Sequence, residues 1–319
     1  MKRNEFHHVY GPVFSKRLGR SLGVDLTPSK TCSYNCIYCQ LGRTSNNTIE
    51  RKDYIQLDSV MGELETKLNS GPFPDYISLA GSGEPTLHNG IGSLIRKIKL
   101  LSQIPVAIFT NGSLLWIPET REDLMDADLV LPSLDAGDNT LFQYVNRPHP
   151  GISFDKMVQG IVQFKEEFSG AVWLEVFLLG GVTGTPSEVK KIASLIEHIN
   201  PDRVQLNTVS RPPAEEFAFA VNSKKMQEFK KLIPGTVELI IEKNPLRVST
   251  QPQPAADNLA ILALLSRRPC TVQGVSSGLG LNPSEVAKQL QHLSRHGEIR
   301  AVRRNDEVFY EKVGLQPYI

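Results

Sequence analysis

The sequence predicts an α/β fold class, a partial (β/α)6 barrel followed by a small C-terminal winged-helix domain. Between about Leu22 and Ile241, short apolar runs rich in β-branched residues alternate with longer segments of helical period, a pattern typical of βα units around a parallel sheet. Small, polar and acidic residues follow the ends of successive apolar runs. A polar stretch interrupted by prolines then precedes a last segment of different composition. We therefore expect a barrel at residues 1–243, a linker at 244–254 and a winged-helix domain at 255–319.

The barrel is expected to contain six βα units and a seventh candidate strand. The expected strands are Leu22–Leu26, Tyr76–Ala80, Val106–Thr110, Leu129–Leu134, Trp173–Leu178, Val204–Thr208 and Val237–Ile241. The expected helices are Ser59–Leu68, Ile91–Leu101, Arg121–Met125, Phe154–Phe168, Ser187–Ile199 and Ser223–Leu232. In such a barrel, functional side chains lie at the carboxyl ends of the strands, where the βα loops converge.

The last segment is expected to form three helices and a β-hairpin. The expected elements are Ala255–Ser266, Val272–Gly278, a helix from Pro283 to about Gly297, Glu298–Val302 and Glu307–Val313. The third helix has a clear start, because Asn282 is a favourable N-cap residue and proline is favoured at the first helical position. The turn of the hairpin is expected at residues 303–306. This order of elements predicts the winged-helix domain.

The composition of the 319 residues limits the class of protein. The formal net charge is +1, so no strong overall field favours nucleic acid or a membrane surface. No apolar run approaches the roughly 18 residues that a membrane span needs. The polar N-terminus is not followed by the apolar core of a signal peptide, which such a targeting segment would need. We therefore expect a cytoplasmic protein without a membrane partner.

Three of the four cysteines are close together in the sequence, at Cys32, Cys36 and Cys39. This C-x3-C-x2-C spacing can hold three corners of a cubane iron–sulfur cluster and leave the fourth iron without a protein ligand. Structural zinc is an alternative, with His7 or His8 as fourth ligand, although zinc modules usually present two pairs of ligands. A disulfide framework does not suit three cysteines within eight residues.

The residues around the triplet carry a family resemblance. A glycine-rich approach from Gly11 to Asp25 precedes the cysteine loop, and the aromatic Tyr38 is the last spacer residue. This stretch resembles the radical S-adenosylmethionine (SAM) superfamily, and residues 10–43 resemble its wyosine-base tRNA synthetase-like iron–sulfur oxidoreductases. The resemblance implies that the three cysteines bind a [4Fe-4S] cluster and that SAM chelates the open iron. Reductive cleavage of SAM would then release methionine and a 5′-deoxyadenosyl radical.

The resemblance also implies SAM contacts near successive strand ends. Tyr38 is expected near the adenine, Asn111 and Asp135 near ribose hydroxyls, and Ser133 near the SAM carboxylate. The motif Gly81–Glu84 resembles the glycine-rich loop that binds the methionine amino group. Turn formation and helix capping are the alternative roles of these polar residues. The full predicted set is Tyr38, Gly81, Ser82, Gly83, Glu84, Asn111, Ser133, Asp135 and Glu175.

Three further residues have less specific signals. Glu175 lies in an apolar run, so its charge has to be paired or point into the barrel cavity, and we expect it to contact SAM or substrate there. Arg211 follows the sixth expected strand and could hold an anionic substrate group or lie at the surface. Cys270 is expected to be a small buried residue, with a role as hydrogen-atom donor as the alternative.

The last domain offers a candidate phosphate-contacting face. Its residues are Lys288, Gln289, His292 and Arg295 on the third helix and Arg303 and Arg304 in the hairpin. Residues 255–319 contain eight Lys/Arg and six Asp/Glu, so strong non-specific nucleic-acid binding is not expected. Nucleic-acid binding and protein docking are both candidate roles.

These features predict a radical SAM iron–sulfur oxidoreductase or transferase that abstracts hydrogen from an unidentified substrate. The candidate substrates are a tRNA base, a small molecule or a protein. A low-potential donor such as flavodoxin or ferredoxin is the expected electron source. Wyosine-base synthetases carry a further N-terminal cysteine set for a second cluster, which this chain lacks, so their condensation with pyruvate is not expected. The alternatives are a glycyl-radical-type activating enzyme and a metal- or redox-sensing winged-helix regulator without SAM turnover.

Overall fold

The computed structural model of the chain describes residues 8–71, 73–240, 258–304 and 307–313, and the predicted linker at 244–254 lies outside them. Its centre is an eight-stranded sheet of β1 (Val9–Ser15), β2 (Gly19–Val24), β5 (Tyr76–Leu79), β6 (Val106–Thr110), β7 (Leu129–Pro132), β8 (Ala171–Leu178), β9 (Arg203–Thr208) and β10 (Val237–Leu239). The strands follow one another in this order across the sheet. All neighbours from β2 to β10 are parallel, and β1 pairs with β2 in the antiparallel direction.

All seven parallel strands coincide with predicted apolar runs, which confirms the α/β class and its mostly parallel sheet. The largest boundary difference is at β2, which begins at Gly19 instead of Leu22 and stops at Val24 instead of Leu26, and β7 stops at Pro132 instead of Leu134. The edge strand β1 is not predicted from the sequence. Gly11 and Pro12 interrupt its apolar pattern, and its register with β2 shifts between Tyr10 and Val13, as is common at edge strands.

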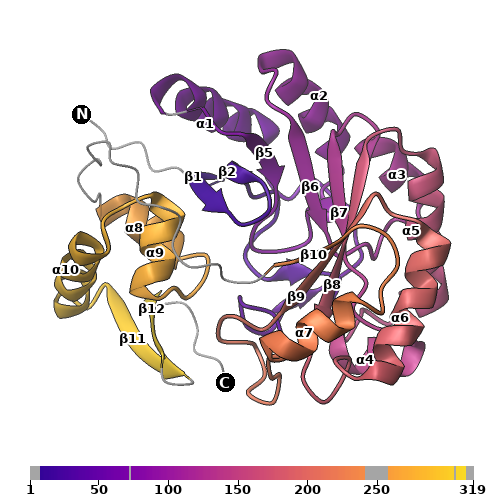
Figure 1. Ribbon diagram of the computed structural model, residues 1–319. Coiled ribbons are helices and arrows are strands. Elements are labelled where there is room, and N and C mark those ends of the chain that lie inside the picture. The colour runs from indigo at the N-terminus through magenta and orange to yellow at the C-terminus, as the bar shows by residue number, and fades with distance from the viewer. Residues whose placement is uncertain (1–7, 72, 241–257, 305–306, 314–319) are drawn as a thin grey trace.

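Helices cover the outer side of the sheet (Figure 1). They are α1 (Leu57–Ser70), α2 (Ile91–Leu101), α3 (Pro118–Leu124), α4 (Asn139–Val145), α5 (Phe154–Glu167), α6 (Pro186–Ile199) and α7 (Ser223–Lys230), with a 3₁₀ turn, η1 (Pro85–Leu87). Side-chain caps start several of them: Ser153 accepts from Lys156 N, and Thr185 accepts from Glu188 N. The short α4 is not predicted from the sequence. Two short strands, β3 (Thr31–Cys32) and β4 (Asn46–Asn47), pair beside the main sheet.

Side chains of the parallel strands alternate between the helices and the barrel interior. On β8, Leu174 and Val176 belong to the main apolar core under the helices, whereas Trp173 packs with an interior cluster. That cluster contains Leu18, from the turn between β1 and β2, together with Leu129 at the start of β7. Because parallel strands all begin at one end, this turn fills the amino end of the barrel with apolar side chains.

The described residues after the linker, 258–304 and 307–313, are called the C-terminal unit below. It contains α8 (Asn258–Leu265), α9 (Val272–Leu279), α10 (Pro283–Arg295), β11 (Ile299–Arg304) and β12 (Glu307–Lys312), and the two strands form an antiparallel pair. The unit has its own apolar core, against which Val13 of β1 packs, and it lies beside β1 and β2 (Figure 1). The predicted element order is therefore present, while the winged-helix interpretation and the domain boundaries stay predictions.

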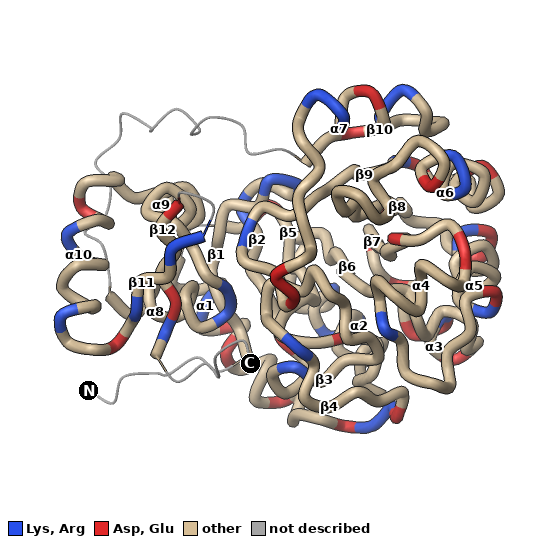
Figure 2. Tube along the Cα trace, turned by 90° about the horizontal axis from the view of Figure 1, so that it is seen from below, with Lys and Arg blue, Asp and Glu red and all other residues tan. Residues whose placement is uncertain are grey.

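The surface carries both kinds of charge. Lys and Arg alternate with Asp and Glu along the helices of the barrel and of the C-terminal unit (Figure 2), in keeping with the net charge of +1. Within the described ranges, no helix is long and apolar enough to cross a membrane.

Candidate functional site

The three clustered cysteines lie on one segment that follows the carboxyl end of β2. Its first part, β3, ends at Cys32 and is called the cysteine strand below, and the whole segment to Cys39 is called the cysteine loop. The end of α4 and the segment after it hold this loop through backbone hydrogen bonds: Ile37 N donates to Val145 O at 2.9 Å, and His149 N donates to Ser33 O at 2.8 Å. On its other side, Glu215 N donates to Ile37 O at 2.9 Å. The loop is therefore fixed by the chain that follows β7 and by the chain that follows β9.

All three thiols are free and half-buried. Burial raises the pKa of Cys32 to about 12, with the nearby Glu84 carboxylate as the next contribution. Burial also raises the pKa of Cys36 well above its ordinary value and raises that of Cys39. Since the thiolate is the form that binds metal, this loop needs a cationic partner at its sulfurs to stabilise the deprotonated ligands.

Two asparagine amides lie beside the sulfurs. Asn111 Nδ2 is 3.5 Å from Cys32 Sγ, and Asn146 Nδ2 is 3.6 Å from Cys36 Sγ. Hydrogen bonds to ligating sulfurs tune the reduction potential of iron–sulfur clusters. Asn111 is in the predicted set, but Asn146 is not. It is the C-cap residue of α4, so only the prediction of that short helix could have brought attention to it.

The glycine-rich loop after β5 lies directly against the cysteine strand. A Cβ on Gly83 would lie only 2.0 Å from Thr31 O, so glycine is required for this close approach. The next residue, Glu84, donates its amide to the same Thr31 carbonyl at 3.1 Å. The predicted motif Gly81–Glu84 and the residue before Cys32 are therefore neighbours.

The Glu84 carboxylate joins two segments of the chain through hydrogen bonds, a structural role that is not predicted from the sequence. It is 2% exposed and accepts hydrogen bonds from the amide and hydroxyl of Thr86, the hydroxyl of Thr110 and the amide of Asn111. Burial raises the pKa of Glu84, and these donors partly offset the rise. The carboxylate thus joins the loop after β5 to the end of β6, and its contact with a SAM ammonium group stays a prediction.

Asp135 organises the next part of the site. Its carboxylate is 3% exposed and accepts from the Tyr38 hydroxyl, from Asn146 Nδ2 at 2.8 Å and from Phe177 N at 3.1 Å. The Tyr38 ring stacks on Phe177 with 4.1 Å between ring centroids. Burial raises the pKa of Asp135 to about 6. Asp135 therefore positions Tyr38 and Asn146, and its predicted ribose contact stays a prediction.

Glu175 is paired inside the barrel. Arg17 Nη1 donates to its Oε2 at 3.0 Å, Arg17 Nη2 also contacts the carboxylate, and Asn207 Nδ2 donates to Oε1 at 3.0 Å. Burial alone would raise the pKa of Glu175, but the Arg17 guanidinium more than offsets this and lowers it. A backbone bridge joins Glu175 to Ser133. The predicted SAM residues Ser133, just after β7, and Glu175, on β8, are therefore adjacent.

Further charged side chains lie around the cysteine loop. Arg43 and Arg147 both donate to the Glu215 carboxylate, with closest distances of 3.1 and 2.5 Å. Arg211, a predicted anion contact, donates to Gln40 at 2.9 Å, next to Cys39. No sequence motif marks Arg43, Arg147 or Glu215, because they are 68 or more positions from their partners.

The residues singled out in the C-terminal unit differ in their exposure and in their partners. Cys270 is 1% exposed and belongs to the core of the unit, as expected of a small buried residue. Lys288, His292 and Arg295 are exposed on α10. Arg303 and Arg304, which were predicted in the turn, lie instead in β11, because the strand extends past Val302. Arg304 is paired with Glu216 at 2.8 Å, and residues 305–306 of the predicted turn lie outside the described residues.

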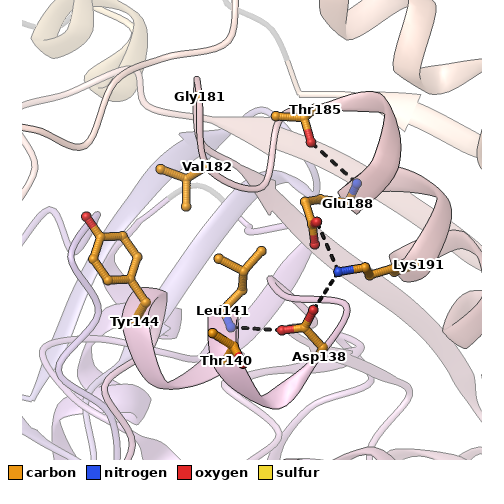
Figure 3. Close-up of a pocket in the computed structure, with 9 residues that line it drawn as sticks. All are labelled: Asp138, Thr140, Leu141, Tyr144, Gly181, Val182, Thr185, Glu188 and Lys191. Atoms are coloured by element: carbon orange, nitrogen blue, oxygen red, sulfur yellow. Dashed lines mark hydrogen bonds and ion pairs between the residues drawn. The ribbon is translucent and has the colours of Figure 1, made fainter.

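A wide, open pocket of about 670 Å³ lies elsewhere, between α4, α6 and the loop after β8 (Figure 3). Its lining includes Tyr144 and the ion pairs of Lys191 with Asp138 and Glu188. No lining residue belongs to the cysteine loop or to the predicted SAM set. We therefore place the candidate site at the cysteine loop and not in this pocket.

The cysteine loop fits an iron–sulfur cluster. The three thiols lie on the same loop, and their pKa values are raised. Side-chain amides lie beside two of the sulfurs. In the part of the chain that the structure describes, no three His, Cys, Asp or Glu side chains are arranged as ligands of a single metal ion. A cubane cluster instead binds each thiolate through a separate iron.

Comparison with known proteins gives a consistent assignment. The family model described as "Radical SAM superfamily" matches residues 26–196. A UPF0026 protein of Helicobacter pylori (strain J99) is 33% identical over 314 residues, which are 97% of this chain and 99% of that protein. A UPF0026 protein of Methanocaldococcus jannaschii is 35% identical over 75% of this chain and 74% of its own length.

A longer relative matches as well. A protein of Brachyspira hyodysenteriae named GTPase Obg is 42% identical over 92% of this chain, and the match spans 43% of that protein. Among solved structures, a radical SAM methyltransferase from Sphaerobacter thermophilus has a TM-score of 0.51 at 18% identity, over 69% of this chain and 66% of its own. SuiB of Streptococcus suis, bound to the precursor peptide SuiA, has a TM-score of 0.52 at 16% identity, over 68% and 48%. At these identities, the two structures show a common fold.

Proposed function

We propose that this chain, which belongs to the radical SAM superfamily, is an enzyme with a single [4Fe-4S] cluster bound by Cys32, Cys36 and Cys39. Members of the superfamily use such a cluster together with SAM, and these are the cofactors of this chain. When bound, the cluster supplies the electron for reductive cleavage of SAM to methionine and a 5′-deoxyadenosyl radical. One observation carries the proposal: three half-buried thiols lie on one loop at the carboxyl end of a parallel barrel, two of them beside amide donors.

The protein residues position and shield the reactants. Asn111 and Asn146 direct their amides at two of the sulfurs, and Glu84 and Asp135 fix the backbone and side chains that carry these amides. The proposed SAM contacts are the predicted ones, Tyr38, Gly81, Ser82, Gly83, Glu84, Asn111, Ser133, Asp135 and Glu175. Their contacts with one another and with the cysteine loop support this assignment.

We infer a hydrogen-abstraction reaction on a macromolecular substrate, with a tRNA base as the leading candidate. The similarity of residues 10–43 to wyosine-base enzymes supports it. A winged-helix interpretation of residues 255–319 would add a substrate-binding domain, and the helix–helix–helix–hairpin order supports that interpretation. α10 carries only two Lys or Arg residues, Lys288 and Arg295, together with the acidic Glu285 in its first turn, so contacts to RNA (Figure 2) would be few and local.

The SAM chemistry is tested by anaerobic reconstitution with iron and sulfide, followed by dithionite and SAM. We expect brown protein with four irons per chain, by the stoichiometry of the cluster, and release of 5′-deoxyadenosine. Fully loaded protein that releases none would refute the proposal. Enzymes of the superfamily need a reductant, and flavodoxin or ferredoxin is the proposed physiological donor in place of dithionite.

The substrate is tested by comparing tRNA nucleosides of a strain that lacks the protein with those of its parent. We expect one modified nucleoside to disappear and its precursor to accumulate. An unchanged nucleoside profile would count against the tRNA assignment while leaving the SAM chemistry in place.

A further inference from the structure

The C-terminal unit extends one arginine side chain to the barrel. Arg267 lies in the turn after α8, and its Nη1 is 2.9 Å from Asp25 Oδ2, just beyond the end of β2. Its Cζ is 3.8 Å from the centre of the Tyr10 ring on β1. The side chains of Arg267 and Asp25 are only 18% and 8% exposed. The ion pair is therefore a largely buried contact between two parts of the chain that are 242 positions apart.

The same carboxylate holds the glycine-rich loop. Asp25 Oδ2 accepts a hydrogen bond from Ser82 N at 3.0 Å and another from the Ser82 hydroxyl. Gly81 lies against Asp25, because a Cβ on Gly81 would be 2.3 Å from Asp25 Cγ. One oxygen atom thus joins the C-terminal unit to the loop.

The opposite side of the loop is bound to the cysteine strand. Lys30 N donates to Ser82 O at 2.7 Å, and Glu84 N donates to Thr31 O at 3.1 Å. The loop therefore lies between Asp25 and the residues that lead to Cys32. A shift of Asp25 would move the loop relative to the cysteines.

Asp25 depends on a cation for its position. Asp25 as a whole is 6% exposed. Among the described residues, the cationic side chain paired with its carboxylate is Arg267. A buried carboxylate that loses its counter-charge is strongly destabilised and has to move or bind water. Either change would weaken its bonds to Ser82.

We propose that Arg267 is a positioning residue of the cofactor site: by pairing with Asp25 it holds Ser82 and the glycine-rich loop against the cysteine strand. The C-terminal unit is thereby part of the SAM site. The identity of this loop as a SAM loop rests on the proposed function, whereas the coupling of Arg267 to Ser82 does not.

The coupling is tested in the protein without cluster or SAM, by amide hydrogen exchange at Ser82. Arg267→Met keeps an apolar side chain of similar length over Tyr10 but removes the charge. We expect Ser82 to exchange about tenfold faster or more, since hydrogen bonds to charged groups contribute most among such bonds. Arg300→Met is the matched control: it removes an arginine paired at 2.5 Å with Glu311, a carboxylate 5% exposed, inside the same unit.

Equal exchange at Ser82 in the wild type and in Arg267→Met would overturn the proposal. So would equal acceleration in both variants, because the effect would then reflect general loosening of the unit. If Arg267→Met does not fold, Arg267→Lys decides: its ammonium keeps the charge without the planar guanidinium, so we expect intermediate exchange, and wild-type exchange would overturn the proposal.

The reconstituted protein gives the second measurement. We expect the Kd for SAM to rise about tenfold in Arg267→Met and to stay within twofold in Arg300→Met, in line with the loss of one charged hydrogen bond. An unchanged Kd in Arg267→Met would refute the link to SAM. If the wild type neither binds nor cleaves SAM while Ser82 exchange still responds to Arg267, the proposed function fails and the coupling stands.

Discussion

The amino and carboxyl ends of the barrel both contain buried side chains, but of different kinds. At the amino end, Leu18 is 3% exposed and packs with Ala107, Leu129 and Leu131. At the carboxyl end, Glu84 and Asp135 are 2% and 3% exposed, and they accept four and three hydrogen bonds.

The difference separates two tasks. Apolar packing is non-directional, so the amino end stabilises the barrel without fixing any reactive group. Hydrogen bonds are directional, and a buried acceptor that lacks its donors is costly, so the carboxyl end fixes the amides and thiols in place. Substitutions at the carboxyl end should therefore affect chemistry first, and those at the amino end stability first.

The largest effect is expected from the cysteines at the carboxyl end. Cys32→Ala, Cys36→Ala and Cys39→Ala each remove one cluster ligand, and we expect loss of bound iron and of 5′-deoxyadenosine formation, because the fourth cysteine, Cys270, is buried in the core of the C-terminal unit. The circular dichroism of the protein without iron should be unchanged. Cys270→Ala, in the core of the C-terminal unit, is the control and should keep both iron and activity.

The amino end is expected to respond in the opposite way. Leu18→Ala should lower the free energy of unfolding by about 3 kcal/mol, the usual cost of truncating a buried leucine, as measured by urea denaturation. Leu100→Ala, at an 88% exposed position on α2, should change it by less than about 0.5 kcal/mol. At temperatures where Leu18→Ala is folded, its iron content should equal that of the wild type, and a loss of cluster would break the comparison between the two ends.

A polar substitution at the carboxyl end should affect both the stability of the protein and its binding of SAM. Glu84→Gln replaces one acceptor oxygen with an NH₂ donor, which has to face the amide of Asn111 or the donors of Thr86 and Thr110. We expect a loss of about 2 kcal/mol in unfolding free energy and weaker SAM binding. Glu65→Gln on the exposed face of α1 is the control. Normal SAM binding in Glu84→Gln would show that the hydrogen bonds of Glu84 stabilise the fold but do not affect binding of the cofactor.

The smallest effect is expected from the pH dependence of the unfolding free energy at Glu215, beside the cysteine loop. The hydrogen bond from Arg43 lowers the pKa of the Glu215 carboxyl, whereas burial raises it. Together with Arg147, Arg43 holds this pKa below the ordinary value. Its stabilising contribution is therefore present above the pKa of the unfolded chain, about 4.3, and is lost as pH falls through the lower folded value. Because Arg43 is 55% exposed, we expect at most about 1 kcal/mol between the wild type and Glu215→Gln at pH 7.

This difference in unfolding free energy should narrow as the pH falls below about 4. A difference that is independent of pH would indicate that the side chain contributes through packing and not through its charge.

The strands and the metal site are largely encoded in local patterns. Runs such as Val106–Thr110 and helices such as Ile91–Leu101 have the predicted bounds, because burial on one side of an element imposes its period on the sequence. The cysteine triplet is equally local, since one loop supplies all three ligands. These patterns were sufficient for the α/β class, whereas the radical SAM assignment came from the resemblance of the stretch around the cysteines to that superfamily.

Other features depended on which segments meet in the folded chain. The strand β1 has a weak pattern and is stable because β2 supplies its partners. Asn146 reaches Cys36 only because α4 ends beside the cysteine loop, and Arg267 reaches Asp25 across 242 positions. A single sequence carries no local signal for such pairs, because each side chain alone would be equally suited to a solvated surface. The sequence by itself therefore determined most of the elements and the thiols, and only the tertiary structure decided the edge strand, the short α4 and which buried charges and amides surround the thiols.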